Sequence, residues 1–115
     1  MQYMLLIYQS EAEFGKLTEA EKGAVYQEYG PFTESINKSG HFRSGSGLQP
    51  TSTATTVRMR SGKRLVTDGP FAETKEQLAG YYLIEAKDLD EAIAIAARVP
   101  SAKFGSVEVR PVIEM

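Results

Sequence analysis

The sequence of 115 residues contains no cysteine and only one histidine, His41. The absence of cysteine excludes disulfide bonds, thiolate nucleophiles and cysteine-ligated zinc. A single histidine does not make a zinc site, because such a site takes three or four protein ligands. We therefore expect neither a metal site nor a disulfide framework in this chain.

Long apolar runs are also missing. No segment approaches the roughly 18 to 20 consecutive apolar residues of a membrane-spanning helix. Residues 1–9 carry neither the basic start nor the small-residue cleavage site of a signal peptide. These absences predict a cytoplasmic protein with no membrane partner.

An excess of basic charge is absent as well, since 13 basic and 15 acidic residues give a net charge of -2. Nucleic-acid binding usually shows a basic excess, because neutralisation of phosphates supplies much of the affinity. The one basic cluster contains Arg58, Arg60, Lys63 and Arg64. We interpret it as the solvated tip of a hairpin, and we expect no nucleic-acid partner.

Two segments, residues 3–8 and 81–84, are apolar on both faces of a strand, which is typical of the middle of a sheet. A hairpin is predicted for residues 53–60 and 64–68, with its turn at 61–63. Apolar and polar side chains alternate along it, so we expect it to be half-buried. Weaker patterns predict an irregular strand over 41–49 and a last strand over about 106–113.

Two helices are expected. Thr18 and Glu21 have the spacing of a capping box, as do Asp88 and Glu91. The first helix ends at Ser39-Gly40, with an expected kink or restart at Gly30-Pro31, and the second stops at Pro100. The expected buried stripes are Val25, Tyr29, Phe32 and Ile36 on the first helix and Leu89, Ala92, Ile93 and Ala96 on the second.

The order of elements predicts a single α+β domain spanning residues 1–115. With the central hairpin as an insertion, it reduces to β-α-β-β-α-β, the ferredoxin-like arrangement, with two helices on one face of an antiparallel sheet. The central strands are apolar on the other face too, so something else must cover it. We expect a homodimer that packs sheet against sheet.

The segment TDGPFAET, residues 67–74, contains the leading candidate for chemistry. Asp68, at the end of an expected strand, is a candidate general base or anchor for a cationic group. The alternative is a turn aspartate that accepts backbone N–H bonds. The long connection to Gly80 favours a functional loop, and Gly69 is expected to take a positive φ.

Charged residues near this segment are candidate helpers. Glu73 and Lys75 face the pocket of Asp68 or, alternatively, form a solvated turn with a salt bridge. Arg110, on the polar face of the last strand, makes either an anion site or an ion pair with Asp68 or Glu73.

Strand tyrosines and the lone histidine complete the candidate set. Tyr8, Tyr81 and Tyr82 pack in the core or an interface, or place a hydroxyl in a pocket. His41 is either a surface or cap residue or a catalytic partner of Asp68. The SGSG stretch at 44–47 is not a dinucleotide fingerprint, and no nucleophile elbow, P-loop or metalloprotease motif occurs. We predict no cofactor.

The run VTDGPFAETKEQLAGYYLIEAKDLDEAIAIAARVP, residues 66–100, and the later GSVEVRPV, residues 105–112, resemble the DGPF-type branch of the YCII-related proteins. The resemblance spans nearly the whole chain. It implies a dimeric α+β barrel built on a ferredoxin-like protomer, and a bacterial origin. The wider group has been suggested to be enzymatic because a histidine and an aspartate line a pocket, for which Asp68 and His41 are the counterparts available here.

Two functions follow. The first is a small-molecule enzyme or binding protein whose pocket lies between the sheet and the segment around Asp68, near the dimer interface. The second is a non-catalytic ligand sensor or accessory protein, since members of the branch often occur beside alternative sigma factors. The first predicts a concave pocket that holds Asp68, and the second predicts no such pocket, or an exposed apolar patch beyond the dimer contact.

Overall fold

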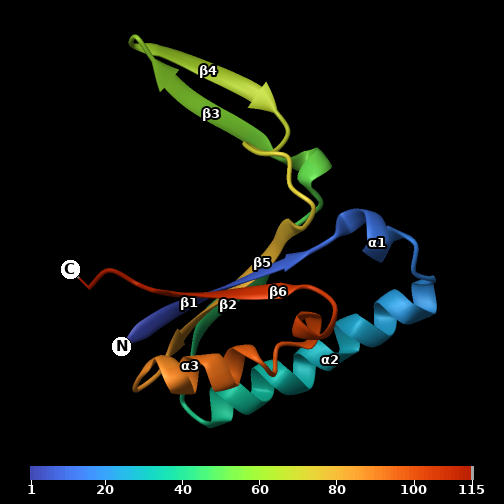
Figure 1. Ribbon diagram of the computed structural model, residues 1–115, viewed down its shortest axis with the longest axis vertical. Helices are drawn as coiled ribbons and strands as arrows, with labels where there is room; N and C mark the ends of the chain where they lie inside the picture. Colours follow the sequence, from blue (N-terminus) through green and yellow to red (C-terminus); the bar gives the residue numbers. More distant parts are fainter. Residues whose placement is uncertain (115) are drawn as a thin grey trace.

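The computed structural model describes residues 1–114, which form an α+β fold with two layers and a projecting hairpin (Figure 1). The helices are α1 (Glu11–Gly15), α2 (Glu19–Lys38) and α3 (Leu89–Ala96). The strands are β1 (Gln2–Gln9), β2 (Phe42–Gly47), β3 (Thr55–Arg60), β4 (Lys63–Asp68), β5 (Gln77–Glu85) and β6 (Ser106–Pro111). Short 3₁₀ turns occupy Thr51–Thr53 and Pro100–Lys103.

The main sheet has the strand order β2-β5-β1-β6, and every neighbouring pair is antiparallel. This is the ferredoxin-like order, with β3 and β4 inserted between its second and third strands as a separate hairpin. The two segments that are apolar on both faces are the central strands β1 and β5, as predicted. The fold class expected from the sequence is confirmed.

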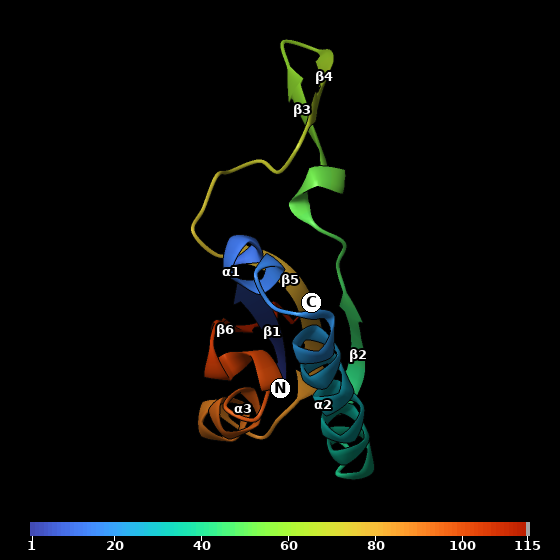
Figure 2. The same ribbon diagram turned by 90° about the vertical axis from the view of Figure 1, so that its right-hand side faces the viewer.

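Helices α2 and α3 lie on the same side of the sheet (Figures 1 and 2). We call the side that they cover the helix face. Its core includes Leu5 and Ile84 from the sheet and Ile36 from α2, each 0% exposed. The buried residues of α2 are Phe32 and Ile36, two members of the predicted stripe.

The buried stripe of α3 differs from the prediction. Ala92, Ile95 and Ala96 are buried, whereas Leu89 and Ile93 are 48% and 49% exposed. Both sets have helical spacing, so periodicity alone does not choose between them. The rotation of the short helix against the sheet decides the outcome.

The predicted capping box at Thr18 forms in full, whereas at Asp88 only the bond from Glu91 N–H forms, because the Glu91 carboxylate accepts from Lys87 N–H at 3.0 Å instead. The Thr18 hydroxyl accepts from Glu21 N–H at 3.1 Å, and the Glu21 carboxylate accepts from Thr18 N–H at 2.8 Å. Asp88 accepts from Glu91 N–H at 2.9 Å in the same way. Pro31 lies inside α2, which continues to Lys38 as one helix and does not restart.

The hairpin turns at Ser61 and Gly62, whose φ angles of 52° and 74° are those of a type I′ turn. The predicted hairpin is therefore correct, but its predicted half-burial is wrong within the protomer. Val57 is 57% exposed and Val66 is 59% exposed. The reason is that the hairpin stands apart from the helices and the main sheet, as Figure 1 shows.

The face of the main sheet away from the helices, here called the open face, has an apolar centre. Met4 and Leu6 of β1 alternate with the buried residues of that strand, and Tyr81 and Leu83 lie opposite them on β5. All four are partly exposed. No helix within residues 1–114 is long and apolar enough to cross a membrane.

Candidate functional site

A cavity of about 720 Å³ lies where the hairpin joins the sheet, and we call it the hairpin cleft. Its walls come from the hairpin base at 49–57, from the segment 70–74 that follows β4, and from Tyr8, Gln77 and Leu78 at the ends of β1 and β5. The walls carry no charged side chain. This is the position in which the sequence predicts a pocket, between the sheet and the segment after Asp68.

Backbone contacts hold the start of that segment. Gly69 has a φ of 100°, the positive value predicted for it. Its N–H donates to the carbonyl of Ala54 at 2.7 Å, and its own carbonyl accepts from the Thr56 hydroxyl at 2.8 Å. The segment therefore leaves the hairpin at a fixed angle, and Phe71, a lining residue, is left 80% exposed.

Asp68 is exposed and does not line the cleft itself. It pairs with Thr55 across the hairpin, and residues directly opposite in an antiparallel pair share a face. Thr55 and Val57, which share that face, do line the cleft. Thr56, on the other face of β3, lines it as well, so the pairing places Asp68 beside lining residues and does not direct its carboxylate into the cleft.

The floor of the cleft is held by a carboxylate that the sequence did not single out. Glu11 accepts from Thr51 twice, from the N–H at 2.8 Å and from the hydroxyl at 2.6 Å. The N–H of Glu11 donates to the side chain of Gln77 at 2.8 Å. These contacts join three segments that lie far apart in the sequence, so no local sequence pattern predicts them. The only local signal is an acidic residue at the start of a helix.

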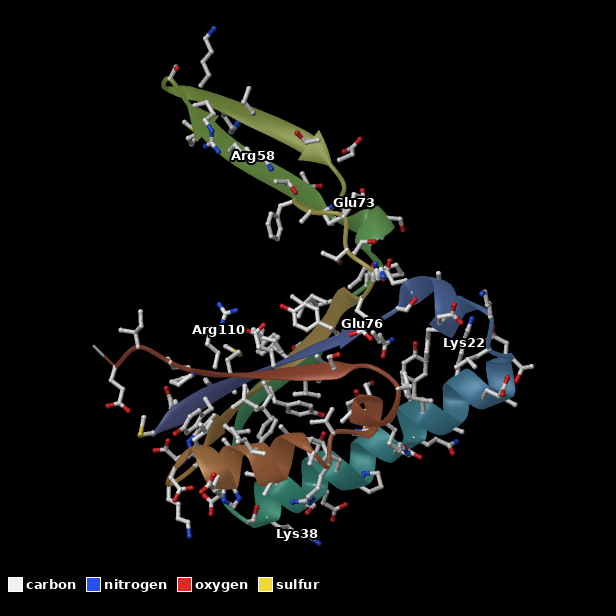
Figure 3. All side chains as sticks on the ribbon, in the orientation of Figure 1. Lys22, Lys38, Arg58, Glu73, Glu76 and Arg110 are labelled. Carbon is white, nitrogen blue, oxygen red and sulfur yellow. The ribbon has the colours of Figure 1, made fainter. Side chains whose placement is uncertain are left out.

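Arg110 and Tyr8 meet on a different carboxylate from the one predicted. The Arg110 guanidinium donates to Glu108 at 2.8 Å, and the Tyr8 hydroxyl donates to Glu108 at 3.5 Å. Hydrogen bonding to Glu108 raises the pKa of Arg110 above its ordinary value. The predicted pairing with Asp68 or Glu73 is wrong, because Glu73 lies beside the hairpin base and Arg110 lies on β6 (Figure 3).

The other predicted helpers lie on β5 and on the segment between β4 and β5. Tyr81 lies on the open face beside Leu6. Glu73 and Lys75 are exposed in the segment between β4 and β5. The next residue along, Glu76, accepts from the Ser106 hydroxyl at 2.7 Å and so ties this segment to β6.

His41 lies at the opposite end of β2 from the hairpin and is not brought to Asp68 within the protomer. Its ring contacts the Ser39 hydroxyl at 2.6 Å and the Glu91 carboxylate at 3.1 Å. The backbone N–H of Lys87 and then the His41 ring hold the pKa of Glu91 below its ordinary value of 4.5. His41 therefore joins the end of α2 to the start of α3.

A second cavity, of about 380 Å³, lies between α2 and the helix face of the sheet, and we call it the helix cavity. Tyr29 contacts the Ser101 hydroxyl at 2.6 Å, and Tyr82 contacts the Thr33 hydroxyl at 2.6 Å. Burial raises the pKa of both tyrosines above the ordinary 10.0. Among residues 1–114, no three His, Cys, Asp or Glu side chains gather as a metal site would require.

The chain matches the profile of the YCII-related domain over residues 1–115. It is also similar to an uncharacterized protein of Rhizobium meliloti (strain 1021), with 38% identity over 113 residues. That alignment covers 96% of this chain and 91% of the relative. The relative carries no stated activity, so the chemistry must be inferred from the side chains themselves.

Proposed function

The chain belongs to the family of YCII-related domains, and we propose that it acts as a homodimer that binds a small molecule in the hairpin cleft. Asp68 serves as the acid or base, or as the polar anchor. The DGPF sequence of residues 68–71 supports placing the chain in the DGPF-type branch of the family. The observation that carries the proposal is the cleft itself, with apolar walls from three segments, one of which begins two residues after Asp68.

The open face supports the dimer. Met4, Leu6, Tyr81 and Leu83 form a continuous apolar patch across two central strands. Ser44 and Ser46 border it on β2, and Glu108 and Arg110 border it on β6. An apolar centre with a polar border is typical of a surface that another protein covers. A second copy packed sheet against sheet covers it with the same apolar surface.

The hairpin supports the same arrangement. Val57 and Val66 are cross-strand partners on one of its faces, and Met59 follows on that face. All three side chains are more than half exposed. A projecting hairpin with apolar side chains is stabilised when it lies along a partner subunit. The hairpin cleft lies at the base of this arm, so the partner also closes it.

Closure matters for Asp68. In the protomer this carboxylate is exposed to water. A partner that covers the cleft excludes water from it, and an acid or base acts most strongly on a ligand in such a site. Tyr8, which lines the cleft, supplies a hydroxyl for orientation. The exposed Glu73 and Lys75 reach the mouth of the cleft from the partner or from the same chain.

Sedimentation velocity tests the dimer. The wild type is expected to sediment at twice the chain mass of 12.7 kDa. Leu83→Glu places a charge on the open face and is expected to give monomers. Leu89→Glu makes the same change on the outer side of α3, where the leucine is already 48% exposed, and should leave the dimer intact. A wild type that is monomeric at every concentration would sink the dimer proposal.

Fragment screening by ¹⁹F NMR tests the ligand site. Ala72→Trp fills the cleft, and Ala24→Trp adds the same side chain on the exposed side of α2. Fragments should bind the wild type and Ala24→Trp but not Ala72→Trp, and hydrogen-bond donors among them should bind Asp68→Asn less tightly. A dimer in which no fragment distinguishes Ala72→Trp from Ala24→Trp would contradict a small-molecule role and favour the accessory-protein alternative.

A further inference from the structure

We infer that the helix cavity is a separate binding site for a neutral aromatic molecule that carries a hydroxyl group. It lies on the helix face of the sheet and shares no lining residue with the hairpin cleft, and Tyr81 is the one member of the open-face patch that borders it. The inference therefore stands apart from the proposed dimer and from Asp68.

Glycines form part of the sheet side of the cavity. Gly45, Gly47 and Gly80, at the paired ends of β2 and β5, all line the cavity. Two of them cannot be replaced without a clash. A Cβ on Gly45 would lie 2.7 Å from the ring of Tyr82, and a Cβ on Gly80 would lie 2.9 Å from the carbonyl of Ser46. Gly47 differs from these two, because a Cβ there would meet no atom within 4 Å, so its missing side chain leaves room for a ligand.

The walls select against charge. No lining residue is acidic, basic or a histidine. An ion in this space would lose part of its hydration without gaining an opposite charge, which is unfavourable. The walls are instead rich in aromatic rings, among them Phe14, Tyr26 and Phe42. Phe14 and Tyr26 already meet edge to face with ring centroids 5.7 Å apart, and a planar ligand can add to this arrangement.

A chain of hydroxyls sets the polar preference. The Ser101 hydroxyl donates to Gln9 at 3.1 Å, so its only proton is used. The 2.6 Å contact between Tyr29 and Ser101 is then a bond that Tyr29 donates. The Tyr29 oxygen keeps a free lone pair beside the cavity, and a ligand hydroxyl can donate to it. A phenol or an aromatic alcohol meets both requirements.

The cavity has an opening to solvent. Tyr26, a lining residue, is 62% exposed, and Ser46 and Gly47 at the end of β2 are also exposed. A cavity of about 380 Å³ is at the lower end of the range for small-molecule sites. It suits a ligand of one or two rings.

Titration with 1-naphthol, followed by ¹H–¹⁵N NMR, tests the inference, with 1-naphthoate as an anionic probe of similar shape. Naphthol should shift the resonances of cavity residues such as Thr33 and Gly80 and leave those of Phe71 and Ala72 in the hairpin cleft unchanged. Naphthoate should bind at least about tenfold more weakly, because its charge finds no partner.

Val25→Phe, on the α2 wall, should abolish naphthol binding, and Ala24→Phe on the exposed side of the same helix should leave it unchanged. If Val25→Phe does not fold, Thr33→Leu fills the cavity from the next turns of α2 and should give the same loss. Equal affinity for naphthoate, no shift of cavity resonances at saturating naphthol, or full binding by a folded cavity-filling variant would each overturn the inference.

Discussion

The two faces of the main sheet are made from neighbouring residues of the same strands, yet they end in different environments. Leu5 is fully buried under the helices, and Leu6, the next residue, is partly exposed on the open face. Tyr82 is buried with its hydroxyl on Thr33, and Tyr81 lies on the open face. A strand that is apolar on both faces needs a packed layer on each of them, and the helices of this chain supply one of these layers.

The faces also differ in chemistry. The charged candidates, Asp68, Glu73, Lys75 and Arg110, all lie on the hairpin or on strands and segments of the open side. The cavity on the helix face is lined by hydroxyls, an amide, aromatic rings, aliphatic side chains and glycines, none of them charged. Chemistry that needs a charge therefore belongs to the open side, where water or a partner subunit can solvate or cover it.

The largest expected effect compares Leu5→Ala with Leu6→Ala. Leu5→Ala removes buried methyl groups from the closed core and should lower the free energy of unfolding by about 2–5 kcal/mol at any protein concentration. Leu6→Ala should cost less in the monomer, and its cost should grow as the protein concentration rises and dimers form. Urea unfolding at two protein concentrations measures both effects.

The cost of Leu6→Ala would not depend on protein concentration if the open face had no partner. Leu6→Ala would then show the same loss at low and at high concentration. If instead both variants lost several kcal/mol at every concentration, the two faces would be equally covered within one protomer, against the partial exposure of Leu6.

A smaller effect compares the two tyrosines of β5. Tyr82→Phe removes the bond to Thr33 and should cost about 1 kcal/mol at neutral pH, whereas Tyr81→Phe should change stability by less than about 0.5 kcal/mol. Burial raises the pKa of Tyr82 and of Tyr29 above 10.0. The folded state therefore holds these protons more tightly than the unfolded state does, so stability is full below pH 10 and falls as the pH rises above it.

Thermal unfolding between pH 8 and pH 11 measures this loss. The wild type should lose stability above about pH 10, and Tyr82→Phe should lose less because only Tyr29 still contributes. If Tyr82→Phe and Tyr81→Phe had the same pH dependence as the wild type, the phenol of Tyr82 would not be more buried than that of Tyr81.

Sequence patterns sufficed where one local rule decides the structure. The capping box at Thr18, the turn at Ser61-Gly62 and the double-sided strands β1 and β5 each depend on residues a few positions apart. The face of α3 could not be chosen, because Leu89 and Ile95 belong to rival stripes of equal spacing.

The sites depend on distant segments and were harder to predict. A long connection between strands was visible in the sequence, and it led to the prediction of a pocket beside the segment after Asp68. That segment does border a cleft. The bridge from Glu11 to Thr51 joins residues 40 positions apart, and nothing local marks it. The helix cavity is lined by residues from α1, α2, β1, β2 and β5 and by Ser101, which meet only in the folded chain, so no sequence motif marks it.

The smallest expected effect is that of Asp68→Asn, compared here with Glu11→Ala at the other carboxylate near the hairpin cleft. Asp68 is exposed and takes part in no side-chain hydrogen bond among residues 1–114, so Asp68→Asn should change the free energy of unfolding by less than about 0.5 kcal/mol. Glu11→Ala removes two bonds to Thr51 and should cost about 1–3 kcal/mol. Urea unfolding at pH 7 measures both.

A loss of about 2 kcal/mol or more in Asp68→Asn would show that its carboxylate holds the loop together, in the way expected of a buried charge-assisted bond. The case for a functional Asp68 would then fall. An unchanged stability with loss of fragment binding would separate the two carboxylates into one that supports the cleft and one that acts on what enters it.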